Sequence, residues 1–502
     1  MDETPKNLWK YYMDRSKYQD HITIPTIDST IESENVNEEV VYIGDLEKRK
    51  QAYGICGECK EPGTGWKWCQ SCNAKRLKDN FKNWTSGNKD IDEFIQQSQL
   101  NAVYYKKYLE WIPFEKFQNI TYIAEGGFGK IYSAEWPEGY IYYWDIENQK
   151  WFRWQNNKYA LKSLNDSSDI CSDFLNEIKS HLQIYHLDIV QCFGITQDPN
   201  NKEYMMVIEY CEYGNLRNYL NKSENYINYK SKIENLLKIA RGLLDIHNAE
   251  KVHKDFHSGN ILLNKIGSPY ISDLGMCQPA NIKQTVKEGI YGVLPYMAPE
   301  VLRGQQYTKA ADIYSFGIIM NELLSEEIPF NDISHDEILV IKICKGLRPT
   351  IPKDIPKLIA DLIIKCWDAE IKNRPTAKEL YQLLKKWYDD MYTAKYNSEA
   401  EIYIQTNECD KIREEKFKNR SNEEKSKSFK THPQAIYTSR LLNFKNLPKP
   451  VNSSDLTSFQ FSSDTSYTAQ TTSANPISEC LDVQLSELEL NEICQDVEDN
   501  IE

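Results

Sequence analysis

The chain contains V-H-K-D-F-H-S-G-N-I-L-L at Val252–Leu263 and K-I-G-S-P-Y-I-S-D-L-G at Lys265–Gly275. In the first stretch, Asp255 lies in an expected loop, and Asn260 follows it by five residues. A second apolar strand then leads toward Asp273. One carboxylate of such a set can accept the proton of an attacking hydroxyl, while an amide oxygen and a second carboxylate hold Mg²⁺ on nucleotide phosphates. Phosphoryl transfer needs a set of groups of this kind.

This segment resembles the catalytic and metal-binding loops of the eukaryotic protein kinases, with Lys254 where Arg is usual and Leu274 where Phe is usual. The resemblance extends over about residues 115–390 and implies an α+β, two-lobed fold with a small β-rich N-lobe and a large helical C-lobe. It implies that Asp255 orients and deprotonates a protein hydroxyl, and that Asn260 and Asp273 bind Mg²⁺ while the γ-phosphate of ATP is transferred.

A glycine-rich turn lies between strand-like residues at Ile120–Tyr132. Backbone N–H groups can approach phosphate closely only where side chains are absent. Against the family pattern G-x-G-x-x-G-x-V, Ala124 takes the place of the first glycine, and the remaining positions are matched by Gly126, Gly129 and Ile131. The resemblance implies that these residues bind the nucleotide.

Lys162 ends the sequence Y-A-L-K, which matches the strand whose lysine holds the α- and β-phosphates. Glu177 follows fifteen residues later in a helical pattern, a suitable distance for the ion pair that holds this lysine. Tyr204–Tyr210 resembles the fifth strand and hinge of the family. By that match, the backbones of Glu209 and Cys211 would hydrogen-bond adenine.

The C-terminal half of the resemblance includes an activation segment that closes with A-P-E at Glu300. In the family, the residue matched by Asp312 braces the catalytic loop, and the arginine matched by Arg374 pairs with the A-P-E glutamate. Cys366-Trp367 favours the tyrosine-kinase-like branch of the serine/threonine kinases. Serine and threonine hydroxyls are therefore the expected acceptors, and tyrosine or dual specificity is the alternative.

Two of the departures from the family pattern bear on the choice of acceptor, and a third bears on regulation. His257 stands where serine/threonine kinases carry Lys, and Val293 where they carry Thr. We hypothesise that His257 acts as the phosphate-side donor, with a charge that varies near neutral pH. Lys254 in place of Arg offers a point charge rather than a bidentate grip on an activation-loop phosphate. Thr285 and Tyr291 are the candidate phosphorylation sites.

Before the kinase-like region, two C-x-x-C pairs are separated by a nine-residue spacer rich in turn residues, and they consist of Cys56, Cys59, Cys69 and Cys72. This spacing predicts a small zinc-ribbon-like module at residues 51–80, in which four thiolates fill the shell of a structural Zn²⁺. The alternative is four free or disulfide-linked cysteines. The module could also dock a protein partner.

A helical linker is expected over residues 81–114, and the aromatic stretch at residues 135–157 favours an extended hairpin over a binding surface.

The 502 residues carry a net charge of -14, which argues against nucleic-acid binding, and they contain no apolar run of about 20 residues that could span a membrane. Most of the thirteen cysteines stand singly, which favours a reducing, intracellular and cytoplasmic setting. Residues 1–50 are expected to be flexible. Residues 391–502 are expected to be a mostly disordered charged and Ser/Thr-rich tail, in which Leu485, Leu488 and Leu490 could form a short docking helix.

Two further interpretations compete with an active protein kinase acting on protein substrates in signalling. One is a pseudokinase scaffold that binds protein partners through the kinase fold and the zinc module. Retention of all five polar residues of the proposed site argues against it, since the loss of one is how such scaffolds usually differ from active members. The other makes the zinc module the functional part, and the module's small size argues against that.

Overall fold

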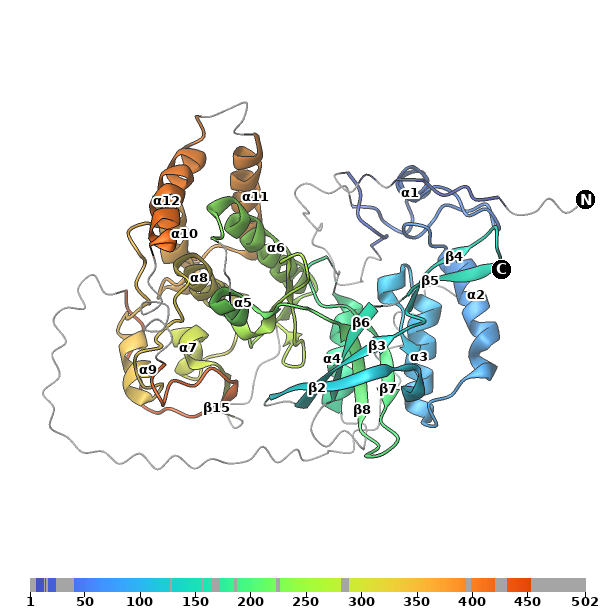
Figure 1. The fold of residues 1–502 in the computed structure, drawn as a ribbon, viewed down its shortest axis with the longest axis horizontal. Coiled ribbons are helices and arrows are strands. Elements are labelled where there is room, and N and C mark those ends of the chain that lie inside the picture. Colours follow the sequence, from blue (N-terminus) through green and yellow to red (C-terminus); the bar gives the residue numbers. More distant parts are fainter. Residues whose placement is uncertain are drawn as a thin grey trace, which may run out of the picture.

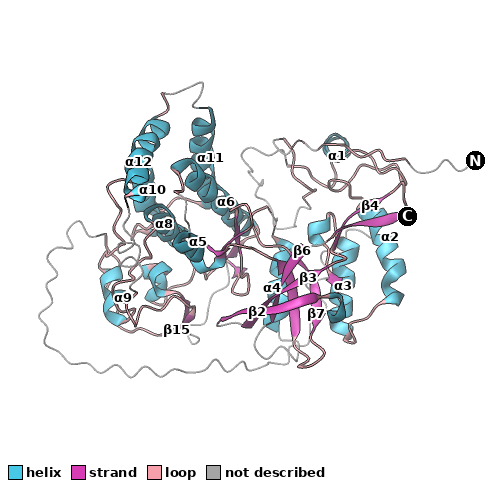
Figure 2. Ribbon diagram, viewed as in Figure 1, coloured by secondary structure: helices cyan, strands magenta, loops and turns pink. Residues whose placement is uncertain are grey.

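The computed structural model describes residues 6–12, 14, 17–23, 40–126, 129–155, 157–163, 172–184, 187–222, 226–280, 289–393, 399–419 and 431–452. Figure 1 shows a helical lobe and a sheet-containing lobe side by side, with a third group of elements beyond the sheet. Figure 2 shows that helices dominate the first of these and strands the second.

The sheet-containing lobe has a six-stranded sheet, ordered β1-β7-β8-β6-β3-β2, within the described residues. Neighbouring strands are antiparallel except for β1 and β7, which are parallel. Its elements are β1 (Glu110–Trp111), β2 (Gln118–Gly126), β3 (Gly129–Trp136), β6 (Asn157–Ser163), α4 (Ser172–Gln183), β7 (Cys192–Gln197) and β8 (Tyr204–Glu209). Apolar residues of α4 and of one face of the sheet share a buried core, so the helix is fixed against the strands.

The helical lobe is organised around α6 and α8, whose apolar residues lie in the largest core of the molecule. Its helices are α5 (Leu216–Lys222), α6 (Tyr229–Asn248), α7 (Pro299–Leu302), α8 (Lys309–Ser325), α9 (Glu337–Cys344), α10 (Lys357–Cys366), α11 (Ala377–Thr393) and α12 (Glu401–Lys418). Its short strands are β9 (Gly214–Asn215), β10 (Lys251–Val252), β11 (Ile261–Leu263), β12 (Pro269–Ile271), β13 (Gln278–Pro279), β14 (Ile290–Gly292) and β15 (Arg440–Leu442). The expected α+β, two-lobed fold is confirmed.

The third group of elements contains α1 (Leu46–Tyr53), α2 (Gln70–Asn80) and α3 (Lys89–Asn101). The aromatic stretch forms the hairpin β4 (Tyr140–Asp145) and β5 (Lys150–Trp154), as expected. This hairpin packs on the cysteine-containing segment: Trp144 lies against the cysteines, and Trp151 contacts Trp68 with ring centroids 6.0 Å apart. The hairpin therefore covers the cysteine module.

The sequence predicts that residues 1–50 are flexible, whereas the described part of this range packs into a core. Ile22 and Val41 are buried with Tyr53 and Val103, because these few apolar side chains find a shared core beside the cysteine module. The predicted helical linker over residues 81–114 is also only partly helical. It contains α3, but it ends in β1, which joins the sheet beside β7.

Within the tail that is expected to be mostly disordered, two described segments are ordered. Helix α12 exposes most of its charges but buries Ile402, and Asp410 accepts hydrogen bonds from the Tyr226 hydroxyl and the Tyr229 N–H. Leu442 in β15 is buried in the core of the helical lobe. A few apolar anchors and specific polar partners hold these segments despite their polar composition. Residues 453–502, including Leu485, Leu488 and Leu490, lie outside the described residues.

No helix in the described parts of the chain combines the length and the apolar character needed to cross a bilayer.

Candidate active site

Asp312, at the start of α8, holds the loop between β10 and β11 through hydrogen bonds to its backbone. Its carboxylate accepts hydrogen bonds from the backbone N–H groups of His253 (2.9 Å) and Lys254 (3.2 Å), and it lies 2.9 Å from His247 Nε2. Lys254 has a positive φ of 68°, which is costly for a non-glycine residue. The expected brace is therefore present, and it fixes the loop in a strained conformation.

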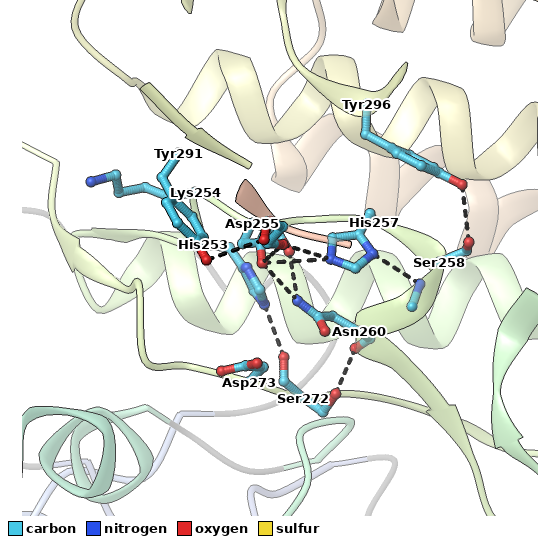
Figure 3. Close-up of polar contacts among 12 residues, drawn as sticks. His253, Lys254, Asp255, His257, Ser258, Asn260, Ser272, Asp273, Tyr291 and Tyr296 are labelled. Carbon is cyan, nitrogen blue, oxygen red and sulfur yellow. Dashed lines mark hydrogen bonds and ion pairs between the residues drawn. The ribbon is translucent and has the colours of Figure 1, made fainter. Parts of the chain in front are cut away.

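Asp255 and Asn260 face one another in this loop (Figure 3). The Asn260 amide nitrogen donates to the Asp255 carbonyl oxygen at 2.9 Å. Asp255 is buried, and its Oδ1 atom has no hydrogen-bond partner among the described residues. Burial acts to raise the pKa of Asp255, but His257 and the Ser439 hydroxyl outweigh it and hold the pKa below its ordinary value. The carboxylate is thus ionised although it is buried.

His257 lies beside Asp255, with Nε2 3.5 Å from Asp255 Oδ2. The Gly259 N–H donates to His257 Nδ1 at 3.0 Å, so Nδ1 is an acceptor and Nε2 is the ring nitrogen that faces Asp255. The ring therefore directs a donor toward the carboxylate. Val293 is buried and supplies an apolar side chain where the family carries a hydroxyl.

Lys162 brings a strand, a helix and a loop together. Its ammonium lies 2.7 Å from Glu177 Oε1 and 2.9 Å from Asp273 Oδ1. Burial acts to lower the pKa of Lys162, but these two carboxylates outweigh it and raise the pKa, so the ammonium stays charged. Burial also raises the pKa of the Glu177 carboxyl, which Lys162 acts to lower. The arrangement joins β6, α4 and the loop after β12.

Asp273 occupies a left-handed backbone conformation with a φ of 59°. The next residue, Leu274, is fully buried, and a Cβ added at Gly275 would lie 3.1 Å from a Glu177 carboxylate oxygen. The D-L-G turn therefore packs directly against α4, which explains why the third position is glycine.

The glycine-rich turn connects β2 to β3, where Gly126 pairs with Gly129 and Ala124 pairs with Ile131. Ile131 in turn pairs with Lys162, which places the turn next to the lysine strand. At the end of β8, the Glu209 N–H donates to the Gln191 carbonyl oxygen at 2.9 Å, and Cys211 is buried two residues later. The residues expected at the nucleotide site thus lie on adjoining strands and their connection.

These residues fit a nucleotide with its metal. The paired glycines present backbone without side chains, Lys162 presents a fixed cation, and Asp273 and Asn260 are oxygen-bearing residues of the kind Mg²⁺ prefers. Glu300 and Arg374 form the expected buried pair, with two hydrogen bonds of 2.6 and 2.8 Å, away from these groups.

The four cysteine sulfurs of the N-terminal unit, from Cys56, Cys59, Cys69 and Cys72, lie within 4.8 Å of one another. The Cys56–Cys72 and Cys59–Cys69 sulfurs are 3.9 and 3.6 Å apart. Thiolates at about 2.3 Å from a tetrahedral Zn²⁺ would be roughly 3.8 Å apart. The cluster therefore has the dimensions of a zinc site.

Ser439 and the segment around it were missed by the sequence analysis. This residue donates a hydrogen bond to Asp255 although 184 residues separate them. Its surroundings in the sequence carry no family motif, and only the apolar residues near Leu442 could have indicated an ordered segment. Of the two candidate phosphorylation sites, Tyr291 lies in β14, whereas Thr285 lies outside the described residues.

Comparison with known proteins gives an independent result for the same region. The family model described as protein tyrosine and serine/threonine kinase matches residues 117–384, more than half of the chain. The RGS domain-containing serine/threonine-protein kinase A of Dictyostelium discoideum is 32% identical over 252 residues, covering 47% of this chain and 22% of that protein.

Two proteins of Arabidopsis thaliana are similarly related. Serine/threonine/tyrosine-protein kinase HT1 is 31% identical over 219 residues, which cover 43% of this chain and 55% of that protein. Serine/threonine-protein kinase VIK is 30% identical over 280 residues, which cover 54% of this chain and 60% of that protein. The chain spans less than two thirds of the length of each of these three relatives.

Proposed function

The chain belongs to the protein tyrosine and serine/threonine kinase family, and we propose that it transfers the γ-phosphate of ATP to serine and threonine hydroxyls of proteins. The observation that carries the proposal is the position of the Lys162 ammonium, which contacts both Glu177 and Asp273. Phosphoryl transfer relies on positioned charges more than on covalent chemistry, and this bridge fixes three charges at once.

In the proposed mechanism, Asp255 orients the acceptor hydroxyl and takes its proton. Lys162 holds phosphate oxygens, and Glu177 keeps the lysine in place. Asn260 and Asp273 would hold Mg²⁺, which neutralises phosphate charge when bound. The backbones at Gly126 and Gly129 approach the phosphates, with Ala124 and Ile131 beside them, and the backbones of Glu209 and Cys211 contact adenine.

We propose that the acceptor specificity follows that of the tyrosine-kinase-like branch. The support is the Cys366-Trp367 pair and the names of the relatives, which are serine/threonine kinases or, for HT1, a serine/threonine/tyrosine kinase. The pseudokinase interpretation is not favoured, because Lys162, Glu177 and Asp273 are present and in contact.

We further propose that the four-cysteine cluster binds structural Zn²⁺, which the sulfur separations support. None of the described cysteines forms a disulfide, which supports an intracellular, reducing setting. We also propose that the cysteine module docks protein partners.

His257 is proposed to act as the phosphate-side donor through Nε2, since the Gly259 N–H occupies Nδ1. Protonation of Nδ1 would break that hydrogen bond, so we expect kcat to change with pH between 6 and 8 in the wild type and less in His257→Lys. Matching pH profiles for the two proteins would rule out this role.

The main test uses radiolabelled ATP and generic protein substrates, followed by phosphoamino-acid analysis. Asp273→Asn should lose nearly all incorporation, whereas Asp361→Asn, at an exposed aspartate paired with its helical neighbour Lys357, should retain it. Equal incorporation by wild type and Asp273→Asn would contradict the proposal. Label confined to phosphotyrosine would contradict the acceptor specificity alone.

A further inference from the structure

The segment at residues 431–452 returns from the helical lobe to the active site. Its strand β15 pairs with β14 in antiparallel register, with Arg440 opposite Gly292 and Leu442 opposite Ile290. Directly before this strand, the Ser439 hydroxyl donates to Asp255 Oδ2 at 2.5 Å and lies 3.5 Å from His257 Nε2. A chain hydroxyl therefore occupies the position where an acceptor hydroxyl is expected.

Contacts on both sides of Ser439 hold the backbone in this place. The Tyr291 hydroxyl donates to the Ser439 carbonyl oxygen at 3.1 Å. The Ile436 N–H donates to His335 Nδ1 at 3.1 Å, and the Arg440 guanidinium donates to the His335 carbonyl oxygen at 2.8 Å. The main chain is thus fixed from three residues before Ser439 to one residue after it.

Three consecutive hydroxyl residues are present here, and the structure distinguishes them. The Tyr437 hydroxyl donates to the Pro329 carbonyl oxygen at 2.8 Å, and its ring lies 4.1 Å from the Arg217 guanidinium. Thr438 is exposed. Of the three, Ser439 is the residue whose hydroxyl donates to Asp255, so the arrangement selects one hydroxyl out of three neighbours.

We propose that Ser439 is a phosphoacceptor of its own chain, and that the segment from His432 to Leu447 is an intramolecular substrate that closes the acceptor site until it is phosphorylated. The inference rests on the proposed function. In the step, Ser439 Oγ forms a bond to the γ-phosphorus of ATP, and the bond from that phosphorus to the β,γ-bridging oxygen breaks. ADP leaves with the electron pair, and Asp255 receives the hydroxyl proton.

The unmodified segment competes with every other substrate, because its hydroxyl already satisfies Asp255 Oδ2 and its backbone occupies the open edge of β14. A phosphoserine carries about -1.5 to -2 charges at neutral pH. Such a group beside the buried, ionised Asp255 experiences like-charge repulsion, so the modified segment leaves the site. Phosphorylation of Ser439 therefore opens the kinase to other proteins.

The first experiment incubates dephosphorylated full-length chain with Mg·ATP over a thirtyfold range of protein concentration, and phosphopeptides are mapped by mass spectrometry. We expect Ser439 to be modified first, with a rate constant independent of protein concentration because the reaction is intramolecular. Ser439→Ala should lose this phosphopeptide, and Thr438→Ala should keep it. A rate proportional to concentration, or no phosphate at Ser439, overturns the proposal.

The second experiment measures amide hydrogen exchange across residues 436–442, a readout separate from turnover. We expect slow exchange in the dephosphorylated chain and in Ser439→Ala, and fast exchange after incubation with Mg·ATP and in Ser439→Glu. Ser439→Glu should also phosphorylate a synthetic peptide of residues 432–447 roughly tenfold faster than Ser439→Ala. Unchanged exchange in Ser439→Glu and in the phosphorylated chain would show that β15 is a permanent structural strand.

The two proposals fail in different ways. If the chain phosphorylates added proteins but never Ser439, the intramolecular substrate is refuted and the kinase assignment stands. If no protein or peptide is phosphorylated, including by Ser439→Glu, the kinase assignment fails and the present inference fails with it.

Discussion

The ammonium of Lys107 donates a hydrogen bond of 2.7 Å to the carbonyl oxygen of Leu182, at the C-terminal end of α4. Lys107 belongs to the connection between α3 and β1, and α4 carries Glu177. Ile91 and Ile95 of α3 share a buried core with Phe174 of α4. The N-terminal unit thus supports, from outside the kinase-like region, the helix that positions the active-site lysine.

Replacement of Lys107 by Met should weaken this support. The change removes hydrogen bonds to the last carbonyl groups of α4 and should lower the unfolding free energy by about 1 kcal/mol, with a fall in kcat as Glu177 becomes less fixed. Urea unfolding and labelled-phosphate transfer measure the two effects. The exposed Lys82→Met is the matched control. An unchanged kcat alongside reduced stability would separate the N-terminal unit from catalysis.

Glu177→Gln should reduce kcat on the order of 100-fold, because the buried Lys162 loses one of its two carboxylate partners while side-chain volume is kept. Initial rates of phosphate transfer at saturating ATP give the measurement. Glu327→Gln, at an exposed glutamate of the helical lobe, is the control and should act as wild type. Full activity of Glu177→Gln would mean that the contact with Asp273 is enough to place the lysine.

Removal of zinc should loosen the N-terminal unit. The purified chain should contain zinc in equal molar amount, and Cys56→Ser should lose it because three thiolates leave the tetrahedral shell incomplete. Since Trp144 packs against the cysteines, its fluorescence should shift on chelation. Elemental analysis and emission spectra check this, with Cys409→Ser as a control outside the cluster. Wild-type zinc content in Cys56→Ser would contradict the assignment.

Stability should fall in mild acid because of His181 on α4. Burial and the nearby Lys162 lower the pKa of His181 from 6.5 to about 3. Between these values the unfolded chain binds a proton that the folded chain excludes. The unfolding free energy therefore decreases as pH falls from 6.5, by up to about 1.4 kcal/mol per pH unit for this residue.

Urea unfolding of wild type and His181→Gln at several pH values tests this sign. The variant should show a shallower loss of stability below pH 6.5, while the difference between the two proteins should be constant above pH 7.5. Parallel curves across the whole range would show that His181 binds its proton equally well in the folded and the unfolded chain.

The residues of the proposed nucleotide site could be identified from sequence because each lies in a local motif of fixed spacing. Asp255 and Asn260 share one short loop, and the Lys162-to-Glu177 interval is set by a strand followed by a helix. The hairpin over residues 140–154 could also be predicted from sequence, since two aromatic runs flank a turn. Local backbone geometry and side-chain chemistry were sufficient for these predictions.

Tertiary structure alone decided where the polar C-terminal segments lie. Residues 431–452 have no strong periodicity, yet Leu442 enters the core and Ser439 reaches Asp255, 184 residues away in sequence. Tertiary structure also decided that the aromatic hairpin packs on the cysteines, because these residues lie far apart along the chain. Sequence fixes which groups are available within a turn or a strand, whereas contacts between distant segments form only when buried apolar surface and matched hydrogen bonds offset the entropy of ordering them.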